Sequence, residues 1–151
     1  ALRCLVTSDR VRLITAGGPG ANVARGLAAL EDQGIRALAV PEGAQITFVV
    51  GSREVNLARL TLGDALGPST TCHTHDDTGS APVLALGPDI CRQPAAAEQV
   101  RATLAAAGVS AERVTPALIG ADSACGLLAL VPADARAAAL AALHPLCATV
   151  S

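Results

Sequence analysis

The feature that most constrains the fold is one order of apolar patterns that occurs twice along the chain. In the first half, a strand-like run at residues 11–15 precedes an amphipathic helix. In the second half, the strand-like run 82–87 precedes a helix whose first turn begins at Pro94. Leu30 and Leu104 occupy matching places in these two helices, about 74 residues apart. The repetition predicts two copies of one structural unit.

Each copy continues with two further strands and a second helix. The expected strands are short apolar runs rich in β-branched residues, and the expected helices carry an apolar stripe at helical spacing. In chain order these elements are the strands 35–40 and 45–50, a helix over 52–66, the strands 112–119 and 126–131, and a helix from about residue 132 that Pro145 ends. Between the copies, residues 67–82 predict a connector with at most a short strand. The whole order predicts an α+β fold with helices on one face of each sheet.

Composition limits the functions that are open to such a chain. Its 151 residues suffice for one ordinary domain or two small ones. The formal net charge is −2, and all 11 positive side chains are arginines spread along the chain, so we expect no nucleic-acid partner. No apolar run approaches about 18 residues, and the opening residues do not resemble a signal peptide. We therefore expect a cytoplasmic protein that does not associate with membranes.

The cysteines indicate neither a disulfide framework nor a metal centre. They are odd in number, widely separated and without a CxxC pair: Cys4, Cys72, Cys91, Cys125 and Cys147. We expect reduced thiols that act mostly as small core residues. The run CHTHDD at residues 72–77 offers zinc-type ligands, but ligands so close together in one segment rarely complete a tetrahedron. The sequence therefore predicts no metal and no cofactor.

The glycine-rich turn at residues 17–22 is the strongest candidate for chemistry. Its sequence, GGPGAN, lacks the Lys of a Walker loop and does not contain the GxGxxG fingerprint of a dinucleotide site. A glycine turn at a helix N-terminus exposes backbone N–H groups at the positive end of the helix dipole, where a carboxylate is accommodated as well as a phosphate. At Gly20, no Cβ would obstruct a ligand that approaches these groups. The residues alone leave open a carboxylate site and a turn that only allows tight packing.

Motifs in both halves extend this interpretation. They are VRLITAGGPGANVARGLAALEDQGI and QITFVV in the first half, and CRQPAAAEQVRATLAAAGVS and LALVPADARAAALAALHPL in the second. Their order and spacing resemble the regulatory half of an aspartate kinase, a tandem pair of ACT domains, or a stand-alone relative of it. The resemblance implies two ferredoxin-like βαββαβ ACT domains, over residues 1–75 and 76–151, with strands exchanged between them as one option. Because the kinase half is not present in these residues, it also implies a chain that is regulatory and not an enzyme.

The resemblance further implies a site for an amino-acid effector, typically lysine or threonine, at an interface between two ACT domains. Carried over to this chain, the loop contributes Gly17, Gly18, Pro19, Gly20, Ala21 and Asn22, neighbouring strands contribute Glu42, Gln45 and Ile46, and the facing strand of the second repeat contributes Cys125, Gly126 and Leu127. The loop N–H groups would bind the effector carboxylate, and the carboxylate of Glu42 would face its ammonium group.

Two functions remain open at this point. In the first, the chain senses an amino acid and regulates an aspartate kinase, through a kinase catalytic region or subunit, or regulates another enzyme in trans. In the second, it is a degenerate ACT pair that acts only in oligomerisation. The intact Gly20 and Glu42 favour the first function. The family's loop usually carries an Asp ahead of its Pro-Gly, and the glycines that stand there in this chain favour the second.

The composition of the core predicts a homodimer. Phe48 is the single aromatic residue, and the chain contains no Met or Trp, so the core consists of small aliphatic side chains that each bury little area, at roughly 25 cal/mol per Å². Two small domains of this kind gain stability from further buried surface between copies. Light scattering at micromolar protein should therefore give the mass of a dimer, and the mass of a monomer would contradict this expectation.

Overall fold

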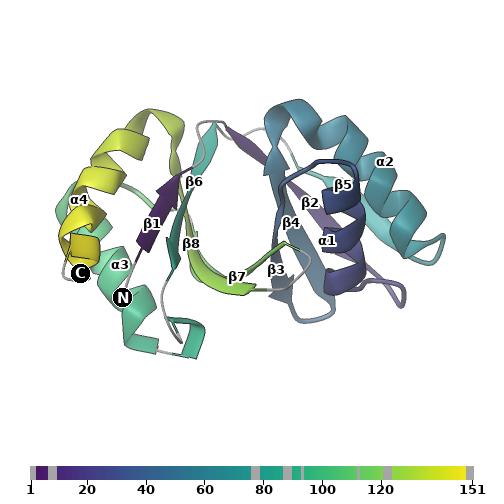
Figure 1. Cartoon of the computed structure of the whole chain (residues 1–151), viewed down its shortest axis with the longest axis horizontal. Helices are drawn as coiled ribbons and strands as arrows, with labels where there is room; N and C mark the ends of the chain where they lie inside the picture. The colour runs from purple at the N-terminus through teal and green to yellow at the C-terminus, as the bar shows by residue number, and fades with distance from the viewer. Residues whose placement is uncertain are drawn as a thin grey trace. The chain divides into compact units, whose positions relative to one another are not determined.

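The computed structural model describes residues 3–6, 10–75, 79–86, 90–92, 94–111, 113–120 and 124–148 (Figure 1). The chain divides into two compact units. Unit 1 comprises residues 1–10, 79–116 and 125–151, and unit 2 comprises residues 11–78 and 117–124. Both units combine helices with an antiparallel sheet, which confirms the predicted α+β class.

Unit 2 has the strand and helix order βαββαβ. Its elements are β2 (Val11–Gly17), α1 (Val23–Asp32), β3 (Leu38–Glu42), β4 (Gln45–Gly51), a 3-10 helix (Ser52–Glu54), α2 (Val55–Leu66) and β5 (Thr71–Thr74). The strands lie in the order β3-β4-β2-β5, and every pair is antiparallel. This is the ferredoxin-like arrangement that the resemblance implied.

Unit 1 repeats this arrangement with one difference in chain order. Its elements are β1 (Arg3–Val6), β6 (Ser80–Leu86), a 3-10 helix (Ile90–Arg92), α3 (Pro94–Ala106), β7 (Arg113–Ile119), β8 (Ala124–Pro132), a 3-10 helix (Ala133–Ala135) and α4 (Arg136–Ala148). Its strands lie in the order β1-β6-β8-β7. Strand β1 comes first in the chain, yet it pairs with β6 in the place that β5 occupies beside β2. The last residues of β7 belong to unit 2, where Leu118 and Ile119 pair with β3.

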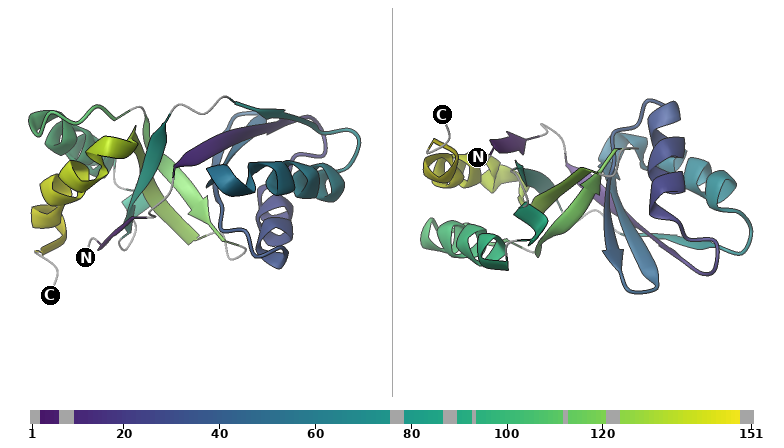
Figure 2. Two further views of the ribbon diagram at one scale, coloured as in Figure 1. Left: turned by 90° about the horizontal axis from the view of Figure 1, so that it is seen from above. Right: turned by 60° about the horizontal axis from the view of Figure 1, so that its bottom comes forward.

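The helices of each unit pack on one face of that unit's sheet (Figure 2). In unit 2 the inward-facing positions of β2 and β4 alternate along the strands, and Ile14, Ala16 and Phe48 are fully buried there. In unit 1 the corresponding core is aliphatic, and it fully buries Leu104 of α3 and nearly all of Leu143 of α4. Among the described residues, no helix combines the length and apolar character needed to cross a membrane.

Helix α4 does not end where the sequence predicted. Pro145 lies inside it, and the helix continues to Ala148. Proline removes one backbone N–H and crowds the preceding turn, which is most costly in the middle of a helix. Because Pro145 lies in the last turn, only a few residues follow it and the disruption stays at the helix end. The helix over 52–66 likewise begins later than predicted, since residues 52–54 form a 3-10 turn.

Gly26→Ala tests the packing of α1 against the sheet of unit 2. A methyl group on Gly26 would lie 2.5 Å from Cζ and 2.8 Å from Cε1 of Phe48, whose ring is fully buried and would have to shift. We therefore expect the free energy of unfolding to fall by about 1–3 kcal/mol in a urea titration, although Ala is the better helix former.

Gly63→Ala is the matched control for this substitution. Gly63 lies in α2, is exposed, and a methyl group there would have no neighbour within 4 Å. Removing the backbone freedom of glycine should raise the free energy of unfolding by about 0.5–1 kcal/mol. If both variants changed stability in the same direction and by the same amount, the close contact between Gly26 and Phe48 would not be the cause.

Candidate functional site

The loop at residues 17–22 connects β2 to α1 in unit 2. The amide of Ala21 donates a hydrogen bond to the carbonyl of Gly18 at 3.1 Å, and Gly18 has a φ of +113°, which favours glycine.

Asn22 is the N-cap of α1, and its Oδ1 accepts a hydrogen bond from the amide of Arg25 at 2.9 Å. By helix geometry, the amides of Val23 and Ala24 precede the first intrahelical hydrogen bond. The loop therefore ends at a helix terminus with positive potential.

Packing within the protein explains why glycine stands at position 20. A Cβ there would lie 2.5 Å from the carbonyl oxygen of Leu66 and would collide with Oγ1 of Thr70. Thr70 is itself held in place, because its hydroxyl donates a hydrogen bond to the same carbonyl of Leu66 at 3.1 Å. The sequence predicted that Gly20 gives a ligand access to the loop, and it did not predict this contact with Leu66 and Thr70. A Gly20→Val variant would therefore disturb the fold as well as any binding.

Gly18 makes a similar close approach. A Cβ on Gly18 would lie 2.5 Å from the carbonyl oxygen of Ser69. The loop is therefore packed along the connection between α2 and β5, residues 67–70. The sequence predicted a connector over residues 67–82, but it contained no signal that this connector contacts the loop 17–22.

Three of the predicted site residues lie side by side on neighbouring strands. Glu42 at the end of β3 pairs with Gln45 at the start of β4, and Gln45 pairs with Gly17 at the end of β2. Sequence reasoning did not include Thr47, whose hydroxyl donates a hydrogen bond to Oε2 of Glu42 at 3.0 Å and whose side chain is buried. The side chain of Ile46 points to the other face of β4 and packs in the core. Gly17, Glu42 and Gln45 thus lie together at the end of the sheet where the loop begins.

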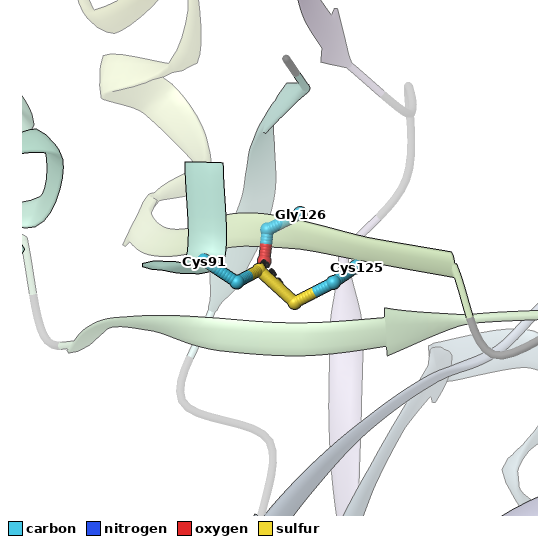
Figure 3. Close-up of a disulfide and its surroundings, with 3 residues drawn as sticks. All are labelled: Cys91, Cys125 and Gly126. Atoms are coloured by element: carbon cyan, nitrogen blue, oxygen red, sulfur yellow. Dashed lines mark hydrogen bonds between the residues drawn. A yellow bond between two sulfur atoms is a disulfide. The ribbon is translucent and has the colours of Figure 1, made fainter. Parts of the chain in front are cut away.

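The remaining predicted site residues belong to unit 1. Cys125, Gly126 and Leu127 lie in β8, and the side chain of Leu127 is buried in the core of that unit. Cys125 is not a free thiol, because it forms a disulfide with Cys91 in the 3-10 helix before α3, with the two Cα atoms 6.3 Å apart (Figure 3). The expectation of reduced thiols is therefore wrong for this pair. Spacing along the chain did not reveal it, because the fold joins cysteines separated by 34 residues.

Cys72 is a free thiol. It lies half-buried in β5 against the core of unit 2, and burial raises the pKa of its thiol. The side chains of Cys4 and Cys147 lie outside the part of the chain whose side chains are described.

The run CHTHDD contributes an edge strand to unit 2. Residues 71–74 form β5, and the amide of His75 continues the pairing by donating a hydrogen bond to the carbonyl of Leu13 at 2.9 Å. Nε2 of His75 lies 2.6 Å from Oγ1 of Thr15, and the guanidinium of Arg12 donates to the carbonyl of His75 at 2.8 and 3.1 Å. The imidazole rings of His73 and His75 meet edge to face, with centroids 4.7 Å apart.

These contacts are structural, since they attach the edge strand to β2. Asp76 and Asp77 lie outside the described residues. Within the described residues, no group of three or more His, Cys, Asp and Glu side chains is arranged to hold a metal ion.

The fold matches solved structures of regulatory proteins. A ligand-free regulatory subunit of aspartate kinase from Thermus thermophilus aligns with a TM-score of 0.59 and 20% identity, covering 96% of this chain and 98% of that one. A putative C-terminal regulatory domain of aspartate kinase from Porphyromonas gingivalis W83 aligns with a TM-score of 0.51 and 13% identity, covering 95% and 94% of the two chains. Aspartate kinase from Synechocystis aligns with a TM-score of 0.57 and 19% identity over 94% of this chain, which is 26% of that enzyme. No protein-family model and no curated protein matches the sequence.

The raised pKa of Cys72 predicts slow alkylation. In the native protein, burial keeps this thiol protonated at mildly alkaline pH, and iodoacetamide reacts with the thiolate. Peptide mapping by mass spectrometry should show slower modification of Cys72 in buffer than in urea at the same pH. The folded state holds this proton more firmly than the unfolded state does. The free energy of unfolding should therefore fall as pH rises from the pKa of the unfolded thiol towards the higher pKa of the folded thiol. Equal alkylation rates in buffer and urea would contradict the burial of this side chain.

Proposed function

We propose that this chain is an allosteric module that senses an amino acid and regulates an aspartate kinase, and that it is not itself an enzyme. The observation that carries the proposal is the fold, which is shared over almost the whole chain with a regulatory subunit of aspartate kinase. The kinase partner is a separate catalytic subunit or a catalytic region of the same polypeptide. We further propose that the module acts in the cytoplasm as a homodimer.

The end of the sheet in unit 2 offers the groups that an amino acid needs. The first amides of α1 and the helix dipole favour a carboxylate beside residues 17–22. Glu42 provides an anion for the ammonium group, and Thr47 orients that carboxylate through its hydrogen bond. Gln45 lies between these two ends, paired with both Gly17 and Glu42. Lysine and threonine are the proposed effectors, and Cys125, Gly126 and Leu127 form the proposed facing strand.

One observation favours a second function, in which the units act only in assembly. The connection 67–70 accounts for the glycines of the loop through packing alone. A loop of this kind can persist after a ligand site has been lost, because the fold continues to require it. Binding experiments separate the two functions directly.

Glu42→Gln tests the sensing function in isothermal titration calorimetry with lysine and with threonine. The substitution keeps an oxygen that can accept the hydrogen bond from Thr47, but it removes the charge that faces the ammonium group. We expect the wild-type protein to bind one of the two amino acids, and the variant to bind it more weakly by roughly 1–3 kcal/mol.

Glu54→Gln is the matched control. Glu54 is also an exposed glutamate of unit 2, but it lies in the 3-10 helix that follows the opposite end of β4. Its substitution should leave the affinity unchanged, and thermal melts without ligand should show both variants folded. An equal loss of affinity in both variants would place the ammonium group elsewhere, and no heat with either amino acid would support the assembly function instead.

A further inference from the structure

The disulfide between Cys91 and Cys125 lies at a distinctive place in unit 1. Cys91 belongs to the 3-10 helix 90–92, between β6 and α3, and Cys125 belongs to β8 (Figure 3). In unit 2, the loop 17–22 occupies the same topological position. Strand β8 of unit 1 corresponds to β4 of unit 2, and Cys125 lies near its start. In unit 2 the pairing of β2 with β4 ends at Gly17 and Gln45. In unit 1, Ala85 of β6 pairs with Leu127, two residues after Cys125. The bond therefore fastens the strand-to-helix connection of unit 1 to the neighbouring strand.

Unit 1 has a hydrophobic core of its own, formed by buried aliphatic side chains. Ile90, next to Cys91, is 2% exposed and anchors the connection in the core. Ala96 and Val100 bury the first two turns of α3 in the same core. Disulfides are typically essential in domains too small to form such a core. Unit 2 supports this reasoning, since it has the same fold and its residues include a single cysteine, Cys72, so it cannot contain an internal disulfide.

Both sulfur atoms belong to residues at intermediate exposure. Cys91 and Cys125 are neither fully buried nor fully exposed, and Sγ of Cys91 lies 3.6 Å from the carbonyl oxygen of Gly126. We therefore expect a thiol reagent from solvent to reach the pair without unfolding of the core. The bond is therefore accessible, and its reduction would affect the connection 90–92 rather than the whole of unit 1.

We propose that Cys91 and Cys125 form a redox-controlled latch on the connection 90–92. When the latch closes, one cysteine thiolate of the protein attacks a low-molecular-weight disulfide. This step releases one small thiol and leaves a mixed disulfide on the protein. The second cysteine displaces the second thiol, so two protein S–H bonds are lost, one S–S bond forms, and two small thiols are produced. A dithiol reductant reverses these steps and becomes a cyclic disulfide. Closing fastens the connection to β8, and opening frees it while Ile90 and α3 keep unit 1 folded.

The latch is tested on the full chain in buffers with a range of ratios of reduced to oxidised glutathione. After acid quenching and alkylation, peptide mapping should show Cys91 and Cys125 passing together between the free and bonded states, reversibly and without urea. Circular dichroism should keep the native helix signal after reduction with dithiothreitol, and the midpoint of thermal unfolding should fall by several degrees. Hydrogen exchange should rise in the peptides that contain residues 90–92 and the start of β8.

Two variants distinguish the latch from a general effect of reductant. Cys91→Ser should match the reduced wild-type protein in exchange and thermal midpoint, and should not respond to dithiothreitol. Cys72→Ser, which changes the free thiol in unit 2, should keep the full response. The proposal would be overturned if the bond resisted dithiothreitol until urea was added, if reduction unfolded unit 1, or if the bond never formed. None of these measurements uses an amino acid, so their outcome is independent of the proposed sensing function.

Discussion

The close contact between Gly26 and Phe48 sets the position of helix α1 on the sheet of unit 2. Because residue 26 has no side chain, the helix backbone approaches the ring of Phe48, which fills the centre of a core otherwise made of aliphatic residues. The position of α1 in turn determines where its N-cap, Asn22, lies. The loop 17–22 is therefore held at both ends, by the pairing of Gly17 with Gln45 and by the start of a helix whose position the core determines.

The two units stabilise the same connection by different physical means. In unit 2 the glycines of the loop allow close van der Waals contact with the connection 67–70. In unit 1 the equivalent segment is anchored by the buried side chain of Ile90 and bound covalently through Cys91. Noncovalent packing responds gradually to ligands and temperature, whereas a disulfide is either formed or broken. The repeat thus holds corresponding connections of one fold by two different physical means.

The fold and the site support the proposed function to different degrees. The fold explains why the loop and the β3–β4 turn meet at one end of the sheet, but many functions use the same fold. The glycines of the loop have a packing role, so the chemical specificity must come from other groups. In the proposed site, those groups are Glu42, Gln45 and the first amides of α1. The hydrogen bond from Thr47 orients the carboxylate of Glu42 within the protein itself.

The sequence by itself determined most of the segments that form helices and strands, and it indicated that they occur as a repeat. It did not predict strand β1, and it gave β5 only as a possible short strand. These features depend on residues a few positions apart, such as the spacing of apolar residues before Leu30 and Leu104. Pro145 shows where local rules fail, since the cost of proline depends on its distance from the helix end. Only the tertiary structure decided that β1 completes the sheet of unit 1, that Cys91 meets Cys125, and that Gly20 lies against Leu66. Each of these contacts joins residues far apart in the chain, and a periodic pattern carries no information about which distant segments become neighbours.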